Sequence, residues 1–145
     1  YVAGVDNSDA ALKVARKNSV INDLQVDWIN SDLIHGPAGE LPREIDLMVS
    51  NPPYVRVVER YHMHANVLDF EPPEALFVTD REPFVYFRAI ASLGKESLKK
   101  QGQVWVEINE NLAQETAQVF ENAGYSGVTV MKDIHEKERY IRASQ

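Results

Sequence analysis

The chain has 145 residues, 44% of them hydrophobic and 26% charged, which suits one globular domain with a substantial core. Cysteine is absent, which excludes disulfides and cysteine-ligated metals and fits a reducing, cytoplasmic location. The formal net charge of −7 disfavours nucleic acid as a partner, because its phosphates would be repelled, and no apolar run is long enough to suggest a membrane partner.

The first part of the chain predicts a strand, a helix and a second strand. Residues 1–5 are mostly apolar and lead into Asp6, as in a buried strand that ends in a polar residue. Capping residues at 7–9 precede apolar residues at helical spacing, which continue to Ile21. A second strand is predicted at residues 26–29. A loop follows it and contains Gly36, Pro37, Gly39 and Pro42.

A third strand is predicted at residues 45–50, where apolar residues are nearly continuous, as expected when both faces of a parallel sheet are covered. Asn51-Pro52-Pro53-Tyr54 ends this strand, because proline cannot continue a hydrogen-bonded ladder. Residues 55–81 lack clean periodicity, so we expect a long functional loop with one helical turn.

The second half alternates again between helices and strands. Pro83 suits the first turn of a helix, and Gly102 and Gly124 are predicted to end the two helices of this half. The predicted elements are a helix from residue 83, a strand at 104–108, a helix at 111–123, and paired strands at 127–131 and 140–143. This order predicts an α/β fold with a mostly parallel sheet and an antiparallel C-terminal strand.

Polar residues stand at the ends of three predicted strands. Asp6 ends the first strand, Ser31 and Asp32 follow the second, and Asn51 follows the third. Ligands of parallel α/β sheets bind outside the carboxyl ends of the strands, so we expect these residues to line a ligand site.

Asn51-Pro52-Pro53-Tyr54 carries the strongest chemical signal. The nitrogen of an amide or aromatic amine is a poor nucleophile because its lone pair is delocalised. The Asn51 side-chain oxygen and the Pro52 carbonyl can accept hydrogen bonds from its protons and draw it towards tetrahedral geometry. The prolines hold these oxygens in advance, and Tyr54 offers a flat face for stacking. The alternative is a rigid turn with Tyr54 as ordinary packing, which the position after a buried strand disfavours.

Three acidic residues have both a functional and a structural interpretation. Asp6 can accept both hydroxyls of a ribose or cap the following helix, and Asp32 can hold the amino group of an adenine or stabilise a turn. Glu107 lies inside an apolar strand, where a carboxylate needs a partner or a pocket. An ion pair and a role in a site both stay open for Glu107.

The long loop contains further candidates. Glu71 and Glu74 bracket two prolines and either position a substrate or are simply solvated. His62 and His64 have the spacing of one strand face, but no third metal ligand is indicated, so we expect no metal site there.

With these residues in place, the chain resembles the HemK/PrmC family, the protein-(glutamine-N5) methyltransferases that act on peptide chain release factors. The resemblance runs from Tyr1 to about Ala143. The matching motifs are Val5-Asp6 with Ser8, Ser31-Asp32-Leu33, Ile45 to Tyr54, Glu71-Pro72, and Val106-Glu107-Ile108. The tetrapeptide alone is shared with adenine-N6 and guanine-N2 methyltransferases, whereas the surrounding set is more specific.

The resemblance implies a Rossmann-like class I fold that uses S-adenosyl-L-methionine to methylate the glutamine of a Gly-Gly-Gln motif in a release factor, the protein partner. The implied cofactor-binding residues are Asp6, Ser31, Asp32, Leu33 and Asn51. The implied catalytic and substrate-binding residues are Asn51, Pro52, Pro53 and Tyr54, with Glu71 near the substrate.

The resemblance also points to missing parts. The glycine-rich loop and first strand that the family carries before the position of Tyr1 are absent, as is its helical amino-terminal domain. We therefore expect residues 1–145 to be a partial catalytic domain that binds cofactor weakly, is inactive alone, and can dimerise or exchange strands through unpaired sheet edges. Asn109 stands where the family usually has glycine.

Two alternatives remain at the level of the sequence. One is a nucleic-acid adenine-N6 or guanine-N2 methyltransferase, which the negative charge disfavours. The other is a catalytically inactive binding module, which the absent glycine-rich loop favours and the intact Asn51-Pro-Pro-Tyr54 disfavours.

Overall fold

The computed structural model describes residues 1–35 and 41–145, so Gly36, Pro37 and Gly39 of the expected first loop lie outside the described residues. The chain forms two compact units, Tyr1–Arg43 and Glu44–Gln145, which we call unit 1 and unit 2.

Unit 1 is a parallel pair of strands with one helix. Its elements are β1 (Ala3–Asp6), α1 (Asp9–Ile21) and β2 (Asp27–Asn30), with Asp6 opposite Asn30 in the register. The Ser8 side chain accepts a hydrogen bond from the Ala11 backbone N–H at 3.2 Å and so caps α1. Leu12 of α1 is fully buried. The strand, helix and second strand predicted for this segment are confirmed.

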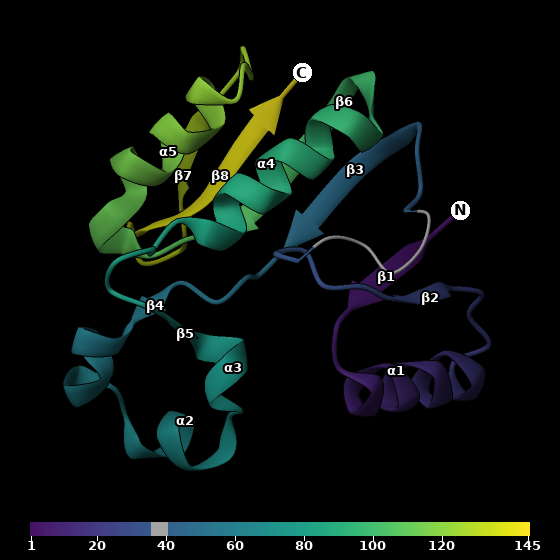
Figure 1. Cartoon of the computed structure of the whole chain (residues 1–145), viewed down its shortest axis with the longest axis horizontal. Helices are drawn as coiled ribbons and strands as arrows, with labels where there is room; N and C mark the ends of the chain where they lie inside the picture. The colour runs from purple at the N-terminus through teal and green to yellow at the C-terminus, as the bar shows by residue number, and fades with distance from the viewer. Residues whose placement is uncertain (36–40) are drawn as a thin grey trace. The chain divides into compact units, whose positions relative to one another are not determined.

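Unit 2 is built on a four-stranded sheet in the order β3-β6-β8-β7 (Figure 1). These strands are β3 (Ile45–Ser50), β6 (Leu98–Glu107), β7 (Thr129–Lys132) and β8 (Glu138–Ser144). β3 pairs with β6 in parallel, and β8 pairs antiparallel with both β6 and β7. The helices are α4 (Val85–Ser97), η2 (Glu110–Leu112) and α5 (Ala113–Asn122).

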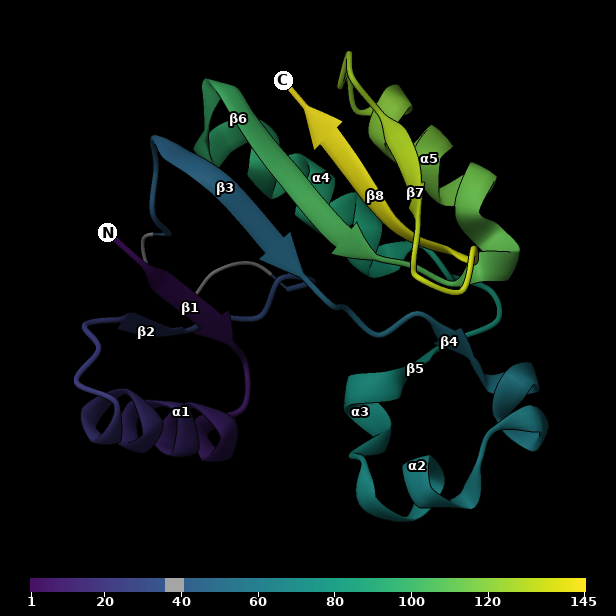
Figure 2. The same cartoon turned by 180° about the vertical axis from the view of Figure 1, so that it is seen from behind.

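The core of unit 2 lies between its sheet and its two long helices. Alternate residues of β6 and β8 are buried, and α4 and α5 supply Phe87, Ile90 and Phe120. Figure 2 shows that α4 and α5 lie behind the sheet on the same side. The opposite side of β3 exposes Leu47 (55%) and Val49 (71%). The prediction that both faces of this strand are covered is therefore wrong within unit 2, because both helices pack on one face.

A structured insert connects β3 to α4. It consists of β4 (Val55–Arg56), η1 (Val57–His62), α2 (Ala65–Phe70), α3 (Pro73–Leu76) and β5 (Phe77–Val78). β4 and β5 pair in parallel, and Val78 is buried. The expected long loop with one helical turn is wrong, because the parallel pairing closes residues 55–78 into a module of short helices.

Gly102 was expected to end a helix, and this is wrong. α4 ends at Ser97, and Gly102 lies inside β6, where a Cβ atom would come within 3.0 Å of the Ile45 carbonyl oxygen. The close approach of β3, and not a helix end, requires glycine here. Pro83 lies two residues before α4, whereas Gly124 follows α5 with a φ of 85°, as predicted.

Candidate functional site

Asn51-Pro52-Pro53-Tyr54 directly follows β3, at the carboxyl end of a strand that is parallel to β6. Pro52 is buried, Pro53 and Tyr54 are half-buried, and Asn51 is exposed. The Asn51 side chain makes no hydrogen bond to any residue that the structure describes. The buried Pro52 thus anchors the backbone, and the Asn51 amide oxygen, which no described residue engages, can accept a hydrogen bond from a ligand.

Tyr54 is bound to the neighbouring strand through its hydroxyl group. The Tyr54 O–H donates to Glu107 Oε1 at 2.6 Å, across 53 residues of sequence. Burial, followed by the hydrogen bond to Glu107, raises the pKa of Tyr54 to about 12. The phenol therefore stays protonated near neutral pH and acts as a donor, not as a base. Glu107 forms this bond and no ion pair within the described residues, so the ion pair considered for it at the level of the sequence is not seen there.

Glu59 links the insert to the residues that directly follow β6. It accepts hydrogen bonds from Asn109 Nδ2 at 2.9 Å and from the backbone N–H of Arg56 at 3.0 Å. Arg56 Nε also donates to it, at 3.2 Å. Burial would raise the pKa of Glu59, but the hydrogen bonds from Arg56 and Asn109 outweigh it and lower this pKa. Glu59 is thus held as a carboxylate at the start of η1.

Arg139 of β8 brings a cation to the same end of the sheet. Its Nε lies 3.4 Å from Asp133 Oδ2, and its Nη2 lies 3.9 Å from Glu110 Oε2. The backbone N–H of Ile108 donates to the Arg139 carbonyl at 3.0 Å, which fixes the end of β6 against β8. The positive charge of Arg139 acts on Tyr54 as well. It partly offsets the rise in the Tyr54 pKa that burial and Glu107 cause.

In unit 1, Asp6 and Ser31 lie together at the carboxyl ends of β1 and β2. The Ser31 backbone N–H donates to the Asp6 carbonyl at 3.0 Å, and Asp6 Oδ1 accepts from the Ser8 backbone N–H at 2.7 Å. The Ser31 hydroxyl is buried and has no hydrogen-bond partner among the described residues. A buried hydroxyl without a partner and a partly free carboxylate fit a polar ligand such as the ribose of a nucleoside.

Asp32 is engaged by its own turn. Its Oδ1 accepts from the backbone N–H groups of Ile34 at 2.8 Å and His35 at 3.2 Å, and its Oδ2 lies 2.9 Å from His35 Nδ1. The hydrogen bond from His35, then those from the two amides, lower the pKa of Asp32 to about 2. An adenine amino group would have to share Oδ2 with His35. Leu33 is half-buried in the same turn.

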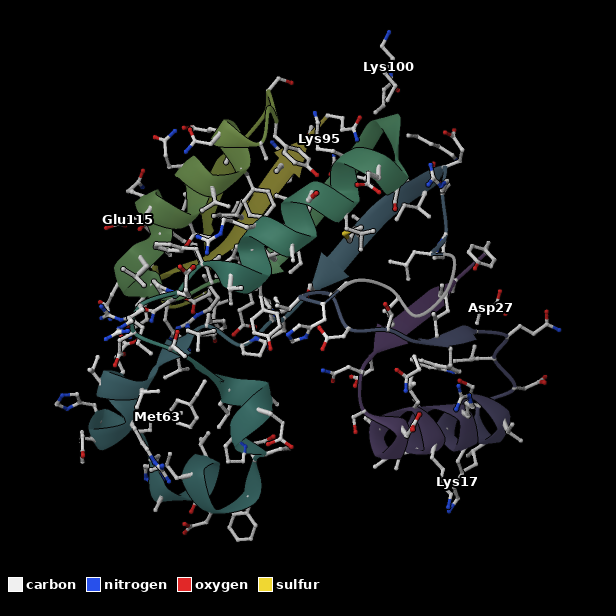
Figure 3. The ribbon with its side chains drawn as sticks, in the orientation of Figure 1. Lys17, Asp27, Met63, Lys95, Lys100 and Glu115 are labelled. Carbon is white, nitrogen blue, oxygen red and sulfur yellow. The ribbon has the colours of Figure 1, made fainter. Side chains whose placement is uncertain are left out.

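The structure does not bring the remaining candidates into these clusters. Glu71 and Glu74 are exposed on the insert, and neither side chain bonds to a described residue. His62 and His64 are also exposed, beside Met63, which Figure 3 marks on the insert. Among the residues that the structure describes, no group of three acidic, histidine or cysteine side chains could hold a metal ion.

Sequence reasoning missed Glu59 and gave Asn109 no role. The only local signal for Glu59 is its spacing of three residues from Arg56, which allows a side chain to bond back to the start of a helical turn. Asn109 could be found only as a departure from a related family. Within the described residues, no helix has the length and apolar character needed to cross a membrane.

Comparison with known sequences finds methyltransferases that are similar to the chain. The Methyltransferase small domain family matches residues 1–69. The chain is 38% identical to the release factor glutamine methyltransferase of Flavobacterium psychrophilum, over 99% of this chain and 50% of that protein. It is 41% identical to that of Bacteroides thetaiotaomicron, over 97% of this chain and 50% of that protein. The chain is homologous to both over nearly its whole length and spans about half of theirs.

Comparison with solved structures agrees. A methyltransferase from Pyrococcus furiosus aligns with a TM-score of 0.69 at 16% identity, over 99% of this chain and 61% of that one. At this identity the likeness shows the fold alone, which is the Rossmann-like α/β fold of S-adenosylmethionine-dependent methyltransferases with a mixed sheet. The predicted fold class is confirmed in these terms.

Proposed function

We propose that this homologue of release factor glutamine methyltransferases carries the residues that methylate the N5 amide of a glutamine, in the Gly-Gly-Gln motif of a peptide chain release factor. The observation that carries the proposal is Asn51-Pro-Pro-Tyr54 at the carboxyl end of β3, with Pro52 buried and the Asn51 amide unbonded among the described residues. A free, pre-placed acceptor is what a weakly nucleophilic amide nitrogen needs.

S-adenosyl-L-methionine, when bound, supplies a methyl group on a sulfonium. In unit 1, Asp6 and Ser31 offer the acceptor and donor for its ribose, and Asp32 with Leu33 would hold its adenine. In unit 2, Asn51 Oδ1 and the Pro52 carbonyl would accept the two N–H bonds of the substrate amide, with Tyr54 against its plane. The amide nitrogen loses one proton to water after it is methylated, so no strong base is required.

A protein substrate is supported by the insert that follows Tyr54. Its η1 and α2 expose Tyr61 (91%) and Phe70 (83%), large apolar surfaces that a protein partner could cover. The net charge of −7 disfavours the alternative substrates, RNA and DNA. Glu71, at the end of α2, would face the same partner.

The test is methyl transfer by the full-length protein that contains residues 1–145, from S-adenosyl-L-methionine to a release factor, read by mass spectrometry of the Gly-Gly-Gln peptide. We expect one added methyl group on the glutamine and none when this glutamine is replaced by glutamate. Methylation of RNA or DNA instead would favour the nucleic-acid alternative. If the folded protein transfers no methyl group and calorimetry detects no cofactor binding, the catalytically inactive binding module is the better interpretation.

A further inference from the structure

The carboxyl end of β6 contacts the segment after Asn51-Pro-Pro twice. Glu107, the last residue of β6, binds Tyr54, and Asn109, two residues beyond β6, binds Glu59 of the insert. Ile108, between them, is fully buried and is bonded through its backbone to β8. The support is therefore a rigid part of the sheet.

The Tyr54–Glu107 contact fixes the ring at its outer end. It is a partly buried, charge-assisted hydrogen bond of 2.6 Å, the stronger type in proteins. The prolines at 52 and 53 restrict the backbone at the other end of the residue. The long axis of the ring is thus held at both of its ends, which fixes the position of the surface that would meet a planar amide.

The Asn109–Glu59 contact fixes the start of η1. Asn109 is 9% exposed and uses both ends of its amide, because Nδ2 donates to Glu59 while Oδ1 accepts from the Asn111 backbone N–H at 3.0 Å. Glu59 in turn accepts from the backbone of Arg56. A glycine at position 109 could make neither side-chain bond.

Building on the proposed function, we propose that Glu107 and Asn109 are positioning residues, which hold Tyr54 and the following turn so that Asn51 and Pro52 meet the substrate amide in reactive geometry. Neither residue touches the substrate in this scheme. Glu107 acts through the Tyr54 hydroxyl, and Asn109 acts through Glu59. Misplacement of such a support lowers kcat more than it weakens substrate binding.

The test is a double-mutant cycle with Tyr54→Phe and Glu107→Ala, measured as kcat and KM for release factor methylation by the full-length protein. We expect each single variant to lower kcat about tenfold with KM changed less than about twofold, and the double variant to be no slower than the slower single one. Glu107→Gln, whose carbonyl can still accept the bond, should keep at least about a third of the activity.

Losses that multiply to about 100-fold in the double variant would overturn the inference, since Glu107 would then act independently of Tyr54. Thermal unfolding of each variant shows whether it is folded, and Glu107→Leu, which suits an apolar strand, replaces Glu107→Ala if that variant is unfolded. An unmodified protein that methylates no Gly-Gly-Gln glutamine defeats the proposed function and this inference together. An active protein with multiplying losses defeats the inference alone.

Discussion

The two units hold their polar strand-end residues in different ways. In unit 1, Asp6 bonds to Ser8, and Asp32 bonds to Ile34 and His35, all within three residues along the chain and largely exposed. In unit 2, Tyr54 and Glu107 are 53 residues apart and partly buried. Local contacts form whenever the turn forms, whereas the contacts of unit 2 exist only when the sheet is assembled. Burial also strengthens the hydrogen bonds of unit 2, because the local dielectric constant is lower than that of water.

The largest expected effect is on kcat, and it follows from a change in unit 2 that leaves cofactor binding by unit 1 nearly unchanged. Asn51→Ala removes the proposed acceptor for the substrate amide, so we expect kcat to fall about 100-fold or more. The dissociation constant for S-adenosyl-L-methionine should stay within about twofold, because Asn51 acts mainly on the substrate. Steady-state kinetics and calorimetric titration measure the two quantities.

Asp6→Ala is the matched change in unit 1. We expect it to weaken cofactor binding about tenfold or more, because the proposed acceptor for the ribose hydroxyls is lost. The kcat at saturating cofactor should fall much less than in Asn51→Ala. If Asp6→Ala and Asn51→Ala weakened cofactor binding equally, unit 1 would not be the unit that binds the cofactor while unit 2 binds the substrate.

A smaller effect is expected when the link between Asn109 and Glu59 is reversed. Asn109→Asp can still cap η2 but cannot donate to Glu59, and it places two carboxylates together. We expect kcat to fall about three- to fivefold and the melting temperature to drop by a few degrees. Glu59→Gln restores a donor opposite the new carboxylate, so the double variant should recover most of both losses. No recovery would contradict a specific contact between the two residues.

The smallest effect concerns the turn of Asp32. Its pKa is lowered to about 2, first by the hydrogen bond from His35, so the contribution of this carboxylate to stability is present above its ordinary pKa and is lost as pH falls towards 2. His35→Ala should raise the Asp32 pKa and move this loss to higher pH. Carboxyl-carbon NMR titration of Asp32 in the unmodified protein and in the variant measures this change. An unchanged Asp32 pKa would mean that the amides alone hold the carboxylate.

The elements of unit 1 could be predicted from sequence because their determinants are local. Ser8 caps α1, Asn22 and Asp23 follow its end, and Asp6 ends β1, each through neighbours along the chain. β3 was also predicted to the residue, since its apolar run is bounded by proline. The insert was missed, because its short helices depend on the pairing of β4 with β5.

The sequence by itself determined the α/β order of elements, the strand-end positions of Asp6, Ser31 and Asn51, and the tetrapeptide whose chemistry suggests amide methylation. Only the tertiary structure decided what supports that tetrapeptide. Glu107 and Asn109 find Tyr54 and Glu59 because β3 and β6 lie side by side, and no local pattern encodes a contact across 50 or more residues. The need for glycine at position 102 also comes from the tertiary structure, because the backbone that approaches it is that of Ile45 in β3, far earlier in the chain.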